Sequence, residues 1–96
     1  MENSISRETI IRECDSLKEL IQIEKQDTSK CRLMIVLGST YEQLNEDSAL
    51  QIYKRTKIFA QGRGLEFWAA IALKESGTLF LKKGDFLSAQ EYFMNS

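Results

Sequence analysis

Apolar side chains recur along this 96-residue chain with the three-to-four-residue spacing of amphipathic helices. Between residues 4 and 26, Ile10, Cys14, Leu17 and Ile21 share one helical face, and charged side chains occupy the rest of the surface. Four further segments show helical spacing, so the pattern predicts an all-α fold of five helices. These segments are residues 29–44, 48–61, 65–83 and 85–96.

The segments between these helices carry residues typical of turns and caps. Asp27-Thr28-Ser29 suits a turn and an N-cap, and Asn45 or Asp47 can cap the helix that follows. Gly62-Arg63-Gly64 ends the third helix, and Gly84-Asp85 both ends the fourth and caps the fifth. Because all these joints are short, each helix is expected to run antiparallel to its neighbours.

A pattern of large apolar, small and aromatic residues occurs twice in the chain. Gly38 and Gly77 are 39 residues apart, and Ala49 and Ala89 are 40 apart. Such self-similarity is typical of architectures that stack one supersecondary unit several times. The positions expected to pack within and between the units are Met34, Leu37, Gly38, Tyr41, Ala49, Tyr53, Leu73, Gly77, Phe80, Ala89 and Phe93.

The two repeated glycines predict that paired helices approach each other closely. Glycine inside a helix costs about 1 kcal/mol relative to alanine, so it is expected where a neighbour comes near. Ala49 and Ala89 are the natural small partners on the following helices, and Tyr53 and Phe93, one turn later, fill the space beside them. Each unit is then a helical hairpin whose apolar side needs a neighbouring hairpin to cover it.

These residues resemble the signature of the tetratricopeptide repeat family, W-x2-L-G-x2-Y…A-x3-F. The second copy matches more fully, from Leu73 through the Gly84-Asp85-Phe86 turn to Phe93. The first copy lacks glycine in its turn, neither copy has the tryptophan, and the period exceeds the usual length of about 34 residues. Long-period versions of the repeat are similar to those of bacterial signalling and regulatory proteins.

The resemblance implies a single domain over residues 1–96, with a leading helix at 4–26 and repeats at 29–61 and 65–96. The first helix of each repeat would line the inner side of a curved stack, where such proteins bind peptides or partner helices. Seven residues beside the packed stripe are expected to face that groove. They are Arg32, Ile35, Ser39, Glu42, Lys74, Thr78 and Lys82.

The function implied by this resemblance is a protein–protein or peptide interaction module in a bacterial sensor or transcriptional regulator. A structural spacer or self-association segment without a ligand is the alternative. The last predicted helix bears on this choice because it is strongly apolar. One explanation is that its residues fold back fully onto the fourth helix. The other, which we favour, is that the sequence is a piece of a longer chain or that this helix pairs with another copy. The residues are Phe86, Leu87, Tyr92, Phe93 and Met94.

The sequence contains few residues that could act in catalysis or bind a metal ion. Histidine is absent, which removes the commonest general base and metal ligand. Cys14 and Cys31 do not form a Cys-x-x-Cys motif, and their helical positions place them roughly 12 Å apart along the hairpin, beyond disulfide range. We therefore expect no enzyme, no metal site, no cofactor and two free thiols, with Cys14 buried in the core.

Four smaller groups of residues have both a functional and a structural interpretation, and the structural one is preferred for each. The segment 61–64 is either a site that binds an anion or simply the connection between two helices. The basic cluster 54–57 is either a binding patch or a set of solvent-exposed charges. The acidic cluster 42–47 lacks further ligands for a cation. Phe67 and Trp68 are expected to seal the joint between hairpins rather than to form a binding platform.

Charge and hydropathy limit the partners further. The 13 basic and 14 acidic residues nearly cancel, so direct contact with nucleic acid is not expected. No apolar run approaches the roughly 20 residues of a membrane span, and the first residues do not resemble a signal peptide. Free cysteines suggest the cytoplasm, although an excised extracytoplasmic fragment would have the same composition.

Overall fold

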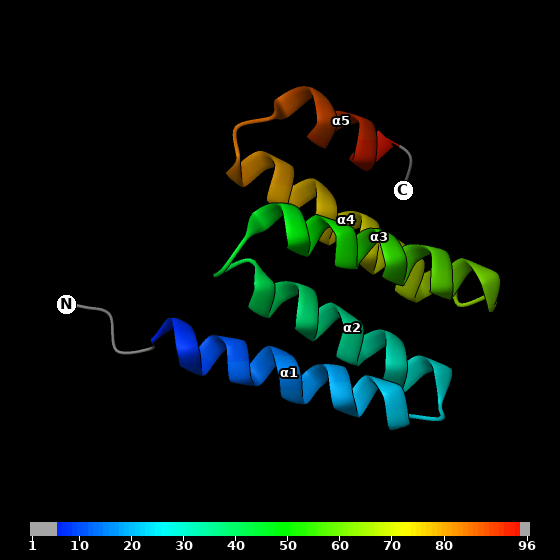
Figure 1. The fold of residues 1–96 in the computed structure, drawn as a ribbon. Coiled ribbons are helices and arrows are strands. Elements are labelled where there is room, and N and C mark those ends of the chain that lie inside the picture. Colours follow the sequence, from blue (N-terminus) through cyan, green and yellow to red (C-terminus); the bar gives the residue numbers. More distant parts are fainter. Residues whose placement is uncertain (1–5, 95–96) are drawn as a thin grey trace.

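Five helices form a row of antiparallel hairpins in the computed structural model, which describes residues 6–94 (Figure 1). The row is a slab of 38 × 36 × 14 Å, and α4 contacts α2 as well as α3 and α5. The predicted all-α hairpin stack is confirmed, and no strand occurs among the described residues. In chain order the helices are α1 (Arg7–Ile23), α2 (Asp27–Tyr41), α3 (Glu46–Gly62), α4 (Glu66–Lys82) and α5 (Phe86–Met94).

Most helices begin and end at the capping residues and glycines that the sequence predicts. The side chains of Asn45 and Asp85 accept hydrogen bonds from backbone N–H groups three residues later, as N-caps do. Gly64 and Gly84 have φ of 71° and 81°, the left-handed conformation that glycine adopts without strain. After each glycine the next N–H donates to a carbonyl five residues back, which is the Schellman arrangement.

The start of α2 differs from the prediction. The helix begins at Asp27, with Gln26 as an N-cap that makes no side-chain capping bond, so Asp27-Thr28-Ser29 is the first helical turn and not the turn before it. Asp27 is stable there because a carboxylate suits the positive end of the helix dipole, and it also pairs with Arg63. The predicted positions 4–5 and 95–96, and the side chain of Tyr92, lie outside the described parts.

The two repeated glycines are buried, and each lies against an aromatic ring on the following helix. A Cβ atom at Gly38 would overlap the ring of Tyr53, which is fully buried. A Cβ atom at Gly77 would lie 2.7 Å from Cε1 of Phe93. The rings therefore occupy the space that any larger residue would need, and this contact fixes how the hairpins α2–α3 and α4–α5 close.

The core consists of three clusters placed between successive helices. One joins Ala49, Leu50 and Tyr53 to Leu79 and so holds α3 against α4. A second joins α1 to α2 through Ile10, Cys14 and Leu37, and a third joins Cys31, Ala60 and Ala69. The buried hydroxyls of Thr56 and Ser76 donate to carbonyls four residues earlier, so they leave no unpaired donor in the core.

We expect Gly38→Ala to destabilise the fold although alanine is the better helix former. Overpacking costs about 1–3 kcal/mol, which exceeds the roughly 1 kcal/mol that alanine gains in a helix, because the buried Tyr53 ring has no room to move. Gly77→Ala should cost less, since Phe93 is 41% exposed and its ring can shift outward. Urea unfolding followed by circular dichroism measures both changes.

Gly62→Ala is the matched control, because a Cβ atom at this last residue of α3 meets nothing within 4 Å. It should leave stability unchanged or raise it slightly. If Gly38→Ala were as stable as Gly62→Ala, the contact with Tyr53 would not constrain the hairpin.

Candidate partner-binding surface

Helices α2 and α4 contact each other, and each has an exposed face. Four of the seven residues predicted to face a groove have exposed side chains that are not tied into the core, although Ser39 also lies within hydrogen-bond reach of the Tyr53 hydroxyl. Arg32 and Ser39 are seven residues apart on α2, and Lys74 and Thr78 are four apart on α4, so each pair shares a helical face. The two exposed pairs therefore lie on helices that contact each other.

The other three predicted residues have structural contacts. Ile35 is half-buried against the cluster that joins α3 to α4. Glu42 accepts a hydrogen bond of 2.5 Å from the hydroxyl of Tyr53 and one of 3.0 Å from Nζ of Lys82. Because one carboxylate connects α2 to both α3 and α4, Glu42 and Lys82 tie the two repeats together and have little freedom to engage a partner.

The two donors of this bridge both have raised pKa values. Burial, followed by the hydrogen bond to Glu42, raises the pKa of Tyr53 far above its ordinary value, so the phenol stays a neutral donor. The hydrogen bond to Glu42 also raises the pKa of Lys82. A second pair, Lys83 Nζ to Asp47 Oδ1 at 2.7 Å, runs parallel to the first between α4 and α3.

Three exposed apolar residues belong to the same surface and were not among the predicted contacts. Val36 lies on α2, and Phe67 and Leu81 lie on α4 at helical spacing from Lys74. The prediction that Phe67 seals the joint is wrong, because its side chain is 70% exposed, whereas Trp68 does pack against the third cluster. Phe67 and Leu81 lie seven residues before and after Lys74, so the helical spacing of the sequence alone would have placed them on the same face as Lys74. We call the seven residues the α2/α4 face: Arg32, Val36, Ser39, Phe67, Lys74, Thr78 and Leu81.

A shallow depression adjoins this face between α1 and α2. Its volume is about 460 Å³, and Val36 and Thr40 form its α2 side. Thr9, Arg12 and Leu17 are among the α1 residues across from them. The face is therefore uneven and mixes apolar, hydroxyl and cationic groups, a composition suited to recognising a peptide.

The two cysteines are buried thiols in different clusters. Cys14 packs with Ile10 and Leu37, and Cys31 packs with Ala60 and Ala69. Both are free, and burial raises the pKa of each thiol. Since the thiolate is the nucleophile, these side chains are small core residues without the exposure or activation that a reactive cysteine needs.

The segment 61–64 is a joint with its polar groups already engaged. The guanidinium of Arg63 lies 3.9 Å from the centroid of the Phe59 ring, and its Nε is 3.4 Å from Oδ1 of Asp27. The N–H groups of Gly64 and Leu65 donate to carbonyls of α3, which leaves them unavailable to an anion. Among residues 6–94, no three potential ligands are grouped to hold a metal ion.

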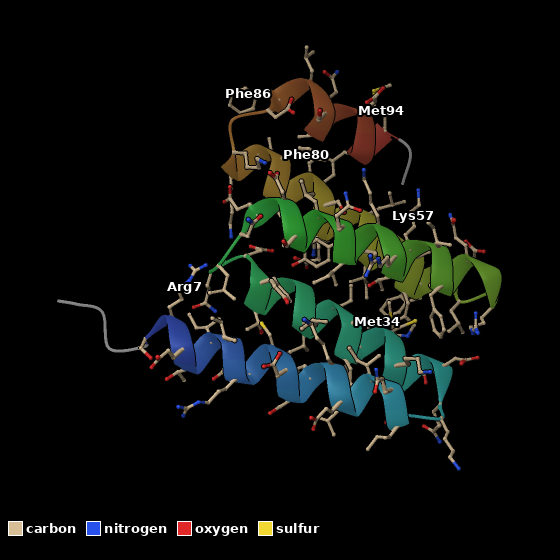
Figure 2. The ribbon with its side chains drawn as sticks, viewed as in Figure 1. Arg7, Met34, Lys57, Phe80, Phe86 and Met94 are labelled. Carbon is tan, nitrogen blue, oxygen red and sulfur yellow. The ribbon has the colours of Figure 1, made fainter. Side chains whose placement is uncertain are left out.

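The last helix carries an exposed apolar surface. Phe86 and Met94, which Figure 2 labels at the two ends of α5, are largely exposed, and Leu87 is 82% exposed. The sequence analysis favoured an explanation in which the apolar residues of this helix do not all fold back onto α4. Phe93 does fold back, with its ring against Gly77, whereas Phe86, Leu87 and Met94 stay largely exposed.

Comparisons with known proteins do not place the chain in a family. No family model matches it, and no match appears among curated proteins or solved structures. Within the described part of the chain, none of the helices has the length and apolar character needed to cross a membrane.

We expect Tyr53→Phe to destabilise the fold, because it removes a hydroxyl donor to the mostly buried carboxylate of Glu42. Hydrogen bonds to charged groups contribute about 1.5–3 kcal/mol. The raised pKa of Tyr53 gives this contribution a pH dependence: it is complete below the ordinary value of 10.0 and is lost as the pH rises above it. Urea unfolding at a series of alkaline pH values measures the effect.

The variant supplies its own control, since it keeps every other ionisable group of the protein. The wild-type protein should lose more stability than Tyr53→Phe as the pH rises above 10.0. Parallel losses in the two proteins would show that the tyrosine hydroxyl makes no special contribution.

Proposed function

We propose that this protein is a non-enzymatic interaction module, similar to tetratricopeptide repeats, that binds a peptide or a partner helix on the α2/α4 face. The observation that carries the proposal is the joint exposure of Arg32, Ser39, Lys74 and Thr78 on two helices that the stack holds side by side. α2 and α4 carry polar side chains one or two helical turns apart, and this spacing allows them to contact an extended or helical peptide at several points along its length.

Several features support this assignment over catalysis. The mixed apolar and cationic side chains of the face offer anchors and orienting groups for a peptide. No nucleophile, base and orienting group can be named together on any described surface. As the role of the whole, we propose partner recognition in a bacterial signalling protein or transcriptional regulator of the cytoplasm, since long-period repeats of this kind resemble those of such proteins and both thiols are free.

Selection from a randomised peptide display library against the immobilised protein tests the proposal. Peptides that bind the wild-type protein should lose affinity by about tenfold or more in the Arg32→Ala/Lys74→Ala variant, because two charge-assisted contacts are removed. Fluorescence anisotropy of labelled peptides measures the change.

The matched control is Lys54→Ala, which removes an exposed cation from α3 outside the face. Its affinity should equal that of the wild type. The proposal fails if the selection yields no binders, or if the selected peptides bind the Arg32→Ala/Lys74→Ala variant as tightly as the wild type.

Self-association is a second candidate function, and the exposed apolar residues of α5 favour it. Phe86, Leu87 and Met94 form an apolar surface on the end helix of the stack, which a soluble monomer seldom presents without a partner. A spacer that joins copies of the chain would need this surface and no peptide ligand.

We expect the wild-type protein to show a concentration-dependent mass in light scattering, and Leu87→Glu/Met94→Glu to be monomeric, because burying two new carboxylates in an interface is costly. The substituted positions are exposed, so the fold should be retained, as circular dichroism can verify. A monomeric wild-type protein at the highest attainable concentration would eliminate this candidate.

A further inference from the structure

A second concave surface is lined by residues of α1 and α3, with residues of α2 as its floor. Its volume is about 520 Å³. The groove exists because α1 and α3 both pack on α2 but, among the described residues, not on each other. Its lining, which we call the α1/α3 groove, is Lys18, Ile21, Gln22, Met34, Leu37, Tyr41, Ser48, Gln51, Ile52 and Arg55.

This groove is separate from the α2/α4 face. At about 3.6 residues per turn, Met34, Leu37 and Tyr41 point to one side of α2, and Arg32 and Ser39 point to the other. Met34, labelled in Figure 2, marks the floor of the groove. Residues that bind at one surface therefore do not contribute to the other, and substitutions can address each surface alone.

The groove is apolar along its floor and cationic at its walls. Lys18 stands on the α1 wall, with its Nζ 5.2 Å from the centroid of the Tyr41 ring, and Arg55 stands on the α3 wall. None of the lining residues is acidic, and Arg55 forms no ion pair within the described part of the chain. The groove is therefore complementary to an apolar segment that carries a carboxylate.

The exposed face of α5 has this composition. Leu87, Glu91 and Met94 are spaced by four and three residues, so they share one helical face, and all three are exposed. The helix Phe86–Met94 contains an acidic residue and no basic one. Lys82 and Lys83 are the basic residues closest to Glu91 in the sequence, and both already form ion pairs, with Glu42 and with Asp47.

We infer that α5 of one copy docks in the α1/α3 groove of a second copy. Leu87 and Met94 then cover the apolar floor, and Glu91 lies between Lys18 and Arg55. This inference rests on the self-association candidate proposed above and names the surface that receives the end helix. The contact would bury both the exposed apolar face of α5 and the apolar floor of the groove, and it would place an acidic residue of α5 beside basic residues of the groove.

The same contact cannot form within one chain. In the stack α5 packs on α4, which lies between α5 and the first three helices (Figure 1). The groove and α5 are at opposite ends of the row, so a contact between them requires two molecules. Such a contact joins two different surfaces and is heterologous: it makes rings or open chains unless two copies exchange α5 reciprocally.

A charge swap on the full chain tests the inference by analytical ultracentrifugation. Arg55→Glu and Glu91→Arg should each weaken association by about tenfold, because each places like charges together. The combined variant Arg55→Glu/Glu91→Arg should regain most of the wild-type affinity. An equal mixture of the two single variants should associate more tightly than either variant alone, since both contacts between unlike copies then pair opposite charges.

Lys74→Glu is the control, since it makes the same charge reversal on the α2/α4 face and should leave association unchanged. Association that survives Arg55→Glu but is abolished by Leu87→Glu/Met94→Glu would overturn this inference while retaining self-association through α5. A combined variant no better than the single ones would also overturn it. The affinity lost in Arg32→Ala/Lys74→Ala reports on the α2/α4 face, whereas the charge swap reports on the α1/α3 groove, so failure of one proposal is distinguishable from failure of the other.

Discussion

The structure depends on the contact between a helical glycine and an aromatic ring on the next helix. At Gly38 and Gly77 the missing side chain leaves room for the rings of Tyr53 and Phe93, and no other residue type would fit without displacing them. This contact sets the separation of the helices in each hairpin. The positions of every exposed side chain on α2 and α4 follow from it, and with them the α2/α4 face.

The two copies of this contact differ in a way that explains how the stack is held together. Tyr53 adds a hydroxyl that donates to Glu42, and Glu42 also pairs with Lys82 of the next repeat. In the second copy the ring belongs to Phe93, and the residue 39 positions after Glu42 is Leu81, so the donor and the acceptor are absent together. The first copy is therefore tied to its successor by polar as well as apolar contacts, whereas α5 is held mainly by packing.

The repeat pattern was sufficient to predict the helices, their antiparallel order and the role of the glycines, because steric contacts between large and small residues leave a clear periodic signal. The surface was harder to predict. Glu42 and Lys82 looked like free polar residues, since nothing in their spacing reveals that a tyrosine eleven positions away donates to the carboxylate. Phe67 looked like a core residue because aromatic side chains at a joint usually are. The α1/α3 groove was not predicted, because it depends on α1 and α3 both packing on α2 without touching each other, which is a tertiary property.

The groove follows from the way in which the described helices pack. α1 and α3 both contact α2 but not each other, so residues of α2 form the floor between them, and α5 contacts α4 at the other end of the row. The charge of the chain is nearly balanced overall, yet the groove lining is cationic and α5 is acidic, so the imbalance is local and opposite at the two places. A neutral chain with complementary ends has little long-range repulsion to oppose association. The proposed partner binding on the α2/α4 face and the proposed association through α5 and the α1/α3 groove are therefore compatible, because they use different sides of α2.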